Sequence, residues 1–232
     1  MMSYDKTILC LANSRRPGGR CVAGKEKINN QFGGWVRPVS NRPTEEISQK
    51  EGRYKDGSDP DVLDIIVIPM IQPKPTGFQS ENHLIDPEYY WEKAGQATWS
   101  QVLAAVDAPS GSLWINGSSS YNGSNDRVIA ASANTLKNSL FLIKPSDLKI
   151  VVATEGEDFG NPRRRVRASF HFNGEYYIFS VTDPFYRDQY LEGENGSFPI
   201  RTGLLCVSLG GLHEDGYAYK LAAAIITPER AR

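Results

Sequence analysis

The sequence has few cysteines and histidines, and it lacks any long apolar run. No run approaches the roughly 18 apolar residues that cross a bilayer, and the opening MMSYDKTILCLANS has no basic region before its short apolar stretch. We therefore expect neither a membrane-spanning segment nor a secretion signal. Three cysteines cannot all pair within one chain, and they form no CxxC or Cys/His cluster. This favours a reduced, cytoplasmic location and argues against a zinc site.

The net charge is also close to zero, because the 232 residues include 26 basic and 27 acidic side chains. Positive charge is nevertheless concentrated near the start, where residues 1–43 hold eight basic and two acidic side chains. Such a basic segment favours an anionic partner, of which phosphate backbones are the commonest. A solvated basic face is the alternative.

Long helices have little room, since 21 glycines and 14 prolines interrupt the chain. The apolar runs between them are short and β-branched, which predicts a mainly β fold of small barrels or sandwiches with one or two short helices. One helix is expected from Thr98, which has capping-box spacing to Gln101, and another over 184–191. Strands are expected over 6–12, 20–25, 34–39, 62–69, 139–143, 148–154, 164–172, 175–182, 203–209 and 217–227.

Two segments without apolar periodicity divide this pattern. Residues 41–60 predict a long solvated loop, and residues 109–126 are rich in Gly, Ser and Asn. We expect a domain boundary in or just after the second segment, giving β domains 1–126 and 127–232. Their similar size suggests a duplicated architecture.

One hairpin follows almost residue by residue, because Asn173-Gly174 is a strong two-residue turn signal. Pairing Phe172 with Glu175 predicts a core face and an outer face. The core face is expected to hold Val166, Ala168, Phe170, Tyr177, Phe179 and Val181. The outer face is expected to hold Arg165, Arg167, Ser169, His171, Tyr176, Ile178, Ser180 and Thr182.

The N-terminal basic segment contains a Gly-Gly loop flanked by arginines. Gly18 and Gly19 could expose backbone N–H groups to an anion, with Arg15, Arg16 and Arg20 beside them. The loop is not a Walker loop, since no Gly-Lys-Ser/Thr closes it, and no cofactor motif is evident. A plain basic hairpin turn is the alternative.

Aromatic rings stand beside arginines in both halves. Trp35 and Arg37 fall on one face of an expected strand, and Tyr176 lies on the outer face that holds Arg165 and Arg167. A ring that stacks on a base next to a phosphate-binding arginine is typical of single-stranded or flipped nucleic acid. The alternatives are a tryptophan that caps a barrel beside an Arg37 ion pair, and a charged edge strand in the second half.

Catalytic constellations are weak. The three histidines are far apart and show no metal spacing, and Cys10 and Cys21 lie in apolar strand patterns. Carboxylates such as Asp61 and Asp64, or Glu155 and Asp158, have the placement of nuclease metal ligands, although acidic loop residues usually only solvate turns.

Several stretches resemble a known family. KTILCLANS at 6–14, GGRCVAG at 18–24, WVRPVS at 35–40, DIIVIP at 64–69 and QSENH at 79–83 are similar to bacterial dual-OB-domain proteins. The residues Leu204, Cys206, Ser208, Leu209 and Gly210 and the stretch YKLAA at 219–223 extend the resemblance over nearly the whole chain. It implies two OB-like barrels and a role near nucleic acid, in loci linked to bacterial conflict or phage defence.

The sequence thus favours a non-enzymatic module that binds single-stranded DNA or RNA as an accessory subunit. In this interpretation phosphates contact Arg15, Arg16, Arg20, Arg37, Arg165 and Arg167, and bases stack on Trp35 and Tyr176. An adaptor that docks on a larger effector protein is the second hypothesis, and a metal-dependent nuclease is the third.

Overall fold

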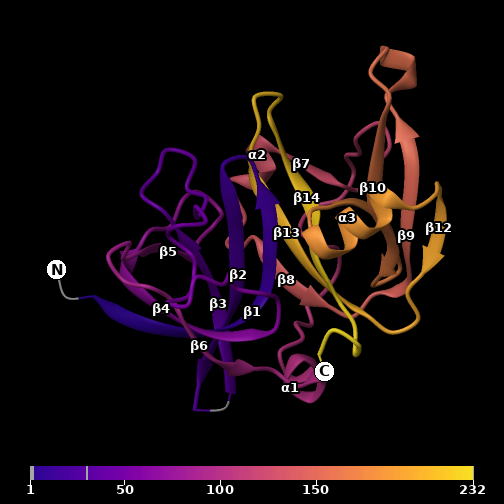
Figure 1. The fold of residues 1–232 in the computed structure, drawn as a ribbon. Helices are drawn as coiled ribbons and strands as arrows, with labels where there is room; N and C mark the ends of the chain where they lie inside the picture. Colours follow the sequence, from indigo (N-terminus) through magenta and orange to yellow (C-terminus); the bar gives the residue numbers. More distant parts are fainter. Residues whose placement is uncertain (1–2, 30, 232) are drawn as a thin grey trace. The chain divides into compact units, whose positions relative to one another are not determined.

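The computed structural model describes residues 3–29 and 31–231, and β-strands make up most of its regular structure (Figure 1). The expected mainly β class is confirmed, and each of the ten expected strands is present. Strands β5, β6, β7 and β12 go beyond the expectation, because runs of three to five residues carry too little pattern to be recognised.

The strands of the first compact unit form a ring. This unit comprises residues 1–106, 137–139 and 228–232. Its strands pair in the order β1-β2-β3-β5-β4, and β4 returns to pair with β1. Strands β3 and β5 run parallel, as in a five-stranded OB barrel. The bounds are β1 Tyr4–Arg16, β2 Gly19–Ile28, β3 Gln31–Val39, β4 Asp64–Pro73, β5 Asn82–Ile85 and β6 Glu92–Gln96.

The core of this ring also takes in part of the segment expected to be a solvated loop. Ile47 and Tyr54 are buried in the same cluster as Ile8, Ile66 and Trp91. Ile47 also forms a β-bridge with Arg20. The segment 41–60 is therefore a loop, as expected, but not a fully solvated one. Isolated apolar residues without periodicity reach the core here, and no local pattern announces them.

The second unit, residues 107–136 and 140–227, repeats the same strand order. Its central strands pair as β9-β10-β11-β14-β13, with β11 and β14 parallel, while β12 and β8 extend the two edges. Both units thus follow the order first, second, third, fifth, fourth, which bears out the suspected duplication. The bounds are β7 Arg127–Ile129, β8 Leu140–Ile143, β9 Ser146–Glu155, β10 Arg163–Phe172, β11 Glu175–Val181, β12 Gly196–Pro199, β13 Leu204–Leu212 and β14 Tyr217–Ile226.

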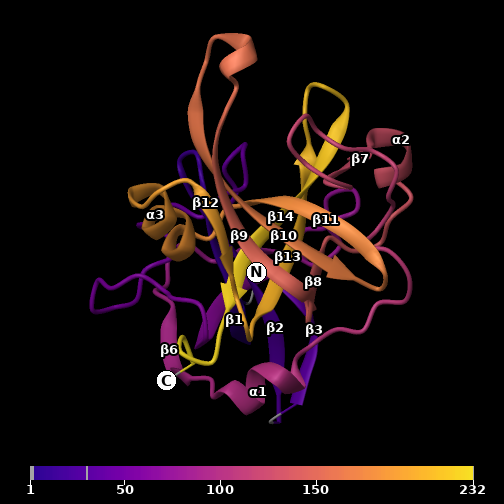
Figure 2. The ribbon, with the colours of Figure 1, turned by 90° about the vertical axis from the view of Figure 1, so that its right-hand side faces the viewer.

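The β10–β11 hairpin has the register expected from its turn. Phe172 pairs with Glu175, and Phe170 pairs with Tyr177. Asn173 and Gly174 both have positive φ, at 49° and 81°, which a type I′ turn requires. The neighbouring β9–β10 hairpin projects beyond the other strands of its sheet (Figure 2). A short 3₁₀ turn, η1 Glu157–Phe159, lies at its tip.

The division between the units differs from the expected boundary at residue 126. The Gly/Ser/Asn-rich loop belongs to the second unit, because hydrogen bonds tie it to that sheet. Ser124 pairs with Ile178 of β11, and the Asn173 side chain donates to the carbonyl of Pro109 at 2.9 Å. The chain returns to the first unit for residues 137–139 and again for 228–232.

Both expected helices are present and short. The helix α1, Trp99–Ala104, begins with a capping box between Thr98 and Gln101, and α3, Pro184–Glu192, begins at the N-cap Asp183. A third helix, α2, spans Ala130–Ala133. Within residues 3–29 and 31–231, no helix combines the length and apolar character needed to cross a membrane.

Candidate nucleic-acid interface

The outer face of β10 and β11 carries the side chains expected from the hairpin register. Arg165 and His171 are exposed on β10, and Tyr176 of β11 is 42% exposed. The Tyr176 ring packs against the His171 ring at a centroid distance of 5.0 Å, and its hydroxyl lies 3.1 Å from Ser169 Oγ. Tyr176 is thus held in place while much of its surface remains open.

A hollow of about 280 Å³ opens on this face, where strand β10 meets two loops. Its lining combines Arg165 and Arg167 of β10 with residues 120–122 and with the β9–β10 connection. Two rings stand at its edge: Tyr121 is 70% exposed and Phe159 is 71% exposed. They meet edge to face at 5.4 Å, and the Tyr121 hydroxyl donates to Asp158 at 2.6 Å. We call this site the β10 hollow.

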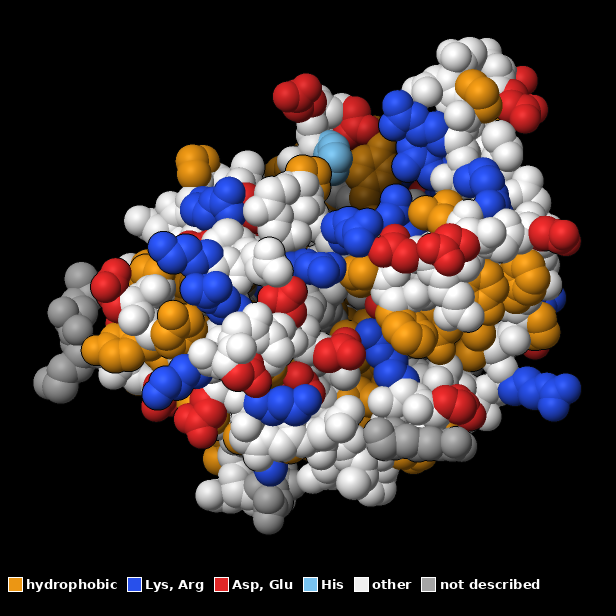
Figure 3. Space-filling model, in the orientation of Figure 1, with side chains coloured by type: hydrophobic (Ala, Val, Ile, Leu, Met, Phe, Trp, Pro, Cys, Tyr) orange, Lys and Arg blue, Asp and Glu red, His pale blue; other side chains and the backbone are white. Residues whose placement is uncertain are grey.

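Charge around the β10 hollow is mixed. Lys and Arg side chains gather along the lower part of the β9–β10 hairpin, and acidic and hydrophobic side chains lie at its tip (Figure 3). The exposed guanidinium of Arg165 makes no hydrogen bond or ion pair with any residue in the described part of the chain. The tip contributes Glu157 and Asp158, so the positive field here is modest.

Arg167, by contrast, is already committed within the protein. Its Nε and Nη2 donate to the two carboxylate oxygens of Glu155 at 2.6 and 2.8 Å, and its Nη1 donates to Ser180 at 3.3 Å. Burial alone would raise the pKa of Glu155, but the hydrogen bonds and charge of Arg167 lower it, together with a hydrogen bond from Asn122 and the charge of Arg165. Arg167 therefore links neighbouring side chains on the sheet surface. Its N–H donors are taken by Glu155 and Ser180, so they do not offer a phosphate the expected two-point contact.

A buried cluster anchors the loop that supplies Tyr121. The Tyr177 hydroxyl accepts hydrogen bonds from the Leu113 backbone N–H and from Asn116 Nδ2, both at 3.0 Å. Lys220 Nζ donates to Asn116 Oδ1 at 2.8 Å and lies 5.6 Å from the Tyr177 ring centroid. Burial lowers the pKa of Lys220 to about 7, although the negative charge of Asp126 opposes the shift.

In the first unit, a carboxylate of the protein itself, that of Glu46, lies against the β1–β2 turn. The carboxylate of Glu46 is buried at the turn and pairs with Arg42 at 3.1 Å, and Arg42 also donates to the carbonyl of Gly18 at 3.2 Å. A hydrogen bond from Thr44 and the charge of Arg42 lower the pKa of Glu46. A Cβ on Gly18 would lie 2.8 Å from Glu46 Oε1, so the expected phosphate cradle is occupied by this carboxylate.

The arginines on either side of that turn differ in their surroundings. Arg15 and Arg16 are exposed at the end of β1, and Arg16 donates to Cys21 Sγ at 3.7 Å. Arg20 is half-buried at the start of β2 and lines a pocket, and its guanidinium has no hydrogen bond or ion pair within residues 3–29 and 31–231. The proximity expected for these three arginines is present, with Arg15 opposite Arg20 in the ladder.

Arg37 points inward and takes the structural alternative raised by the sequence. It is 6% exposed, its Nη2 lies 3.3 Å from Glu81 Oε1, and it donates to Ser139 Oγ at 2.9 Å. Ser139 in turn donates to Glu81. A phosphate contact by Arg37 would break this buried network. Trp35 is half-buried, with Lys25 Nζ 5.7 Å from its ring centroid.

The carboxylates considered as nuclease ligands have partners within the protein. Asp64 is buried, accepts from the Tyr54 hydroxyl at 2.8 Å and pairs with Lys93, while Asp61 pairs with Arg230. The described residues contain no group of three or more His, Cys, Asp or Glu side chains arranged to hold a metal ion.

Tyr121, Phe159 and Asn122 lie at the β10 hollow but were missed by sequence reasoning. Each comes from a loop in which no strand or helix period assigns a direction to the side chain. The available signal was only that a Gly/Ser/Asn-rich segment contained a lone tyrosine.

The strand order has a counterpart among known families. A family model described as the dual OB-containing domain matches residues 6–225. Comparisons with curated proteins and with solved structures found no match. Since the family model spans the strands of both units, the chain belongs to the dual OB-containing domain family.

Proposed function

We propose that the second unit binds single-stranded nucleic acid across the outer face of β10 and β11. The observation that carries the proposal is the β10 hollow, where the exposed side chain of Arg165, without a hydrogen-bond partner among the described residues, stands beside the exposed rings of Tyr121 and Phe159. OB folds commonly bind oligonucleotides on the face of their second and third strands and on the loop between their first and second strands. In this unit those elements are β10, β11 and the β9–β10 connection.

Each part of the site suits one part of an unpaired strand. Base rings stack on exposed aromatic side chains without regard to sequence, and guanidinium groups contact the phosphates. Tyr121 and Phe159 supply the rings, Tyr176 offers a further one along the face, and Arg165 supplies the phosphate contact. Arg167 and Arg37 are left out of this set, because carboxylates of the protein hold both.

The acidic tip limits how strong this binding can be. Glu157 and Asp158 lie beside the arginines, and the whole chain carries a net charge of −1. We therefore expect affinity in the range of non-specific binding, roughly 10⁻⁴–10⁻⁶ M at physiological salt. Partner proteins of an accessory subunit would add contacts that this range does not include.

Fluorescence anisotropy of the whole chain with labelled single-stranded DNA, single-stranded RNA and duplex tests the proposal. Phe159→Ala should remove about 1–3 kcal/mol of stacking, which is roughly 5- to 150-fold in Kd. Arg165→Ala should lower the slope of log K against log salt by about 0.7 for a single strand. Matched controls are Phe185→Ala and Arg201→Ala, an exposed ring and an exposed arginine of the same unit outside the hollow.

Two results would count against the proposal. If the control variants weaken binding as much as the site variants, the strand does not occupy the β10 hollow. If no polymer binds below about 100 μM even at low salt, strand binding by the isolated chain is excluded. A complex that survives nuclease treatment would then favour docking on a larger protein.

A further inference from the structure

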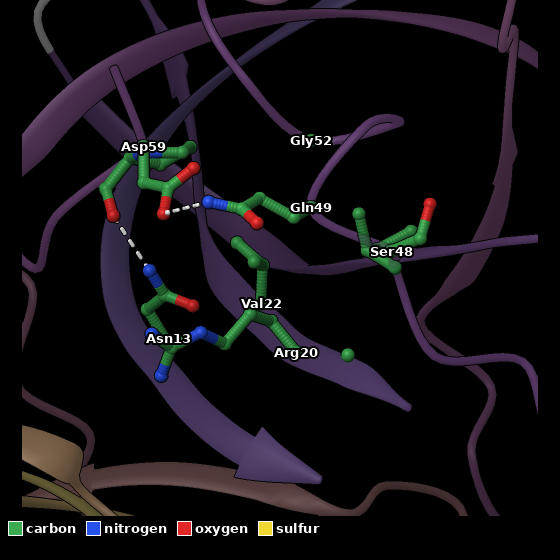
Figure 4. Close-up of a pocket in the computed structure, with 10 residues that line it drawn as sticks. Asn13, Arg20, Val22, Ser48, Gln49, Gly52 and Asp59 are labelled. Atoms are coloured by element: carbon green, nitrogen blue, oxygen red, sulfur yellow. Dashed lines mark hydrogen bonds between the residues drawn. The ribbon is translucent and has the colours of Figure 1, made fainter. Parts of the chain in front are cut away.

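A separate pocket of about 180 Å³ lies in the first unit, between the β1–β2 hairpin and the loop that follows β3 (Figure 4). Asn13 and Val22, which are opposite each other in the ladder, face Gln49 and Asp59 of the loop. We call it the β1–β2 pocket. It shares no residue with the β10 hollow, and its argument does not depend on strand binding by the second unit.

The β1–β2 pocket contains a hydrogen-bond acceptor without a donor. Asn13 Nδ2 donates to the carbonyl of Pro60 at 2.6 Å, and this hydrogen bond sets the orientation of the side-chain amide. The other end, Oδ1, is buried and takes no hydrogen bond from any described residue. A buried acceptor in this state carries a desolvation cost, which a ligand N–H placed in the pocket would relieve.

The pocket walls suit a flat ring more than a chain of polar groups. Val22, Ile47 and Pro60 line it with apolar surface, and all three are buried. Drug-sized ligands need about 300–1,000 Å³, so this space admits a single ring system and leaves any larger attached group outside. Gly52 also lines the wall, where an added Cβ would lie 2.7 Å from Ile47 Cγ2.

The polar groups at the pocket opening define what such a ring would carry. Asp59 offers a second acceptor, and among the described residues its carboxylate takes only a long hydrogen bond of 3.4 Å from Gln49. Arg20 lines the pocket without a partner for its guanidinium among the described residues, and Arg15 is opposite it in the ladder. The interior therefore favours N–H donors, and the arginines favour an anion outside.

We propose that the β1–β2 pocket takes the base of a nucleotide that bears an exocyclic amino group. The amino N–H donates to Asn13 Oδ1, the ring lies between the apolar walls, and the phosphate contacts Arg20. A base with a carbonyl in place of the amino group brings an acceptor against an acceptor and is disfavoured. The same chemistry is offered by a free nucleotide and by an unstacked residue of a strand.

The test compares matched pairs of ligands. Calorimetric titration of the whole chain uses CMP and UMP, which exchange an amino group and a ring acceptor for a carbonyl and a ring N–H, and the nucleosides cytidine and uridine, which lack the phosphate. We expect CMP to bind at least about fivefold more tightly than UMP, because UMP in the same pose places its carbonyl against Asn13 Oδ1 and leaves that buried acceptor unpaired. Asn13→Ala should weaken CMP about 3- to 10-fold, and Arg20→Ala should weaken CMP but not cytidine.

Lys55→Ala is the matched control, since Lys55 is exposed in the same loop and does not line the pocket. The wild-type ranking of the ligands needs no variant, so the proposal stays testable if Asn13→Ala does not fold. Equal binding of CMP and UMP would overturn it, and so would no binding of any of the four ligands up to about 10 mM together with equal binding of oligo(dC) and oligo(dT). So would binding of N-acetyl-arginine amide alone, since that result assigns the acceptors to a cationic side chain.

Oligo(dC) and oligo(dT) distinguish the two sources of the base. Asn13-dependent preference for oligo(dC), without binding of CMP, supports amino-group recognition and assigns the base to a strand. The result is separable from the proposed function, because Phe159→Ala and Arg165→Ala leave this pocket intact while Asn13→Ala leaves the β10 hollow intact.

Discussion

Lys220 gives the protein a pH-dependent cost of folding that can be worked out from its surroundings. The side chain is buried in β14, and its pKa falls from a reference near 10.4 to about 7. One pKa unit corresponds to about 1.36 kcal/mol. When Lys220 is charged in both the folded and the unfolded chain, the lowered pKa therefore reduces the free energy of unfolding by on the order of 4–5 kcal/mol.

The sign follows from where each state loses its proton. Below about pH 7, Lys220 is charged in the folded and the unfolded chain, so the whole cost is present. Between about pH 7 and 10.4 the folded state releases its proton while the unfolded state keeps it, and stability contributed by this group rises with pH. From pH 6 to pH 9 the gain should be about 2–3 kcal/mol.

Lys220→Met isolates this contribution, since methionine fills similar space without a charge. The variant loses the hydrogen bond to Asn116, but that loss is largely independent of pH. Urea unfolding at pH 6, 7, 8 and 9 should show the stability of the wild type rising relative to the variant by about 2–3 kcal/mol. Lys149→Met, at an exposed lysine of the same unit, should show no such trend. A wild-type-to-variant difference that stays constant across this range would refute the assigned pKa.

Two further predictions concern packing in the first unit. Arg37→Met should lower the free energy of unfolding by about 3–5 kcal/mol, because the carboxylate of Glu81 stays buried without its cation. Urea unfolding measures the loss, and a change below about 1 kcal/mol would contradict the assignment of Arg37 to the core. Gly19→Ala should cost about 1–3 kcal/mol, since the added Cβ would lie 2.2 Å from the carbonyl oxygen of Ile47. Gly34→Ala, with no atom within 4 Å of its added Cβ, is the matched control, and equal melting temperatures of the two variants would speak against this close approach.

The parts of the fold that sequence reasoning predicted are those determined by local chemistry. The Asn173-Gly174 turn sets the register of β10 and β11, and the capping box at Thr98 starts α1. In both cases residues a few positions apart determine the outcome, so no distant partner has to be known. The face of the hairpin that carries Arg165 and Tyr176 follows from the same register.

The parts that escaped prediction depend on pairs that are distant in sequence. Arg37 and Glu81 are separated by a long loop and strand β4, and nothing around Arg37 distinguishes an inward from an outward guanidinium. Tyr121 and Phe159 meet only because two loops converge on the β10 hollow. A count of charges along the sequence does not show which arginines form ion pairs. In the folded chain Arg37 and Arg167 pair with carboxylates, whereas Arg165 is exposed.

The repeated strand order shows where the two units can differ in function. Their first and second strands are joined at equivalent points of the topology, but the joins differ in length and chemistry. In the first unit a tight turn at Gly18 lies against Glu46, and the ligand site that we propose is the β1–β2 pocket beside it. In the second unit the longer join carries Phe159 into the edge of an open hollow. Because the strand order is shared, it does not determine a ligand, and the loops decide what each unit binds.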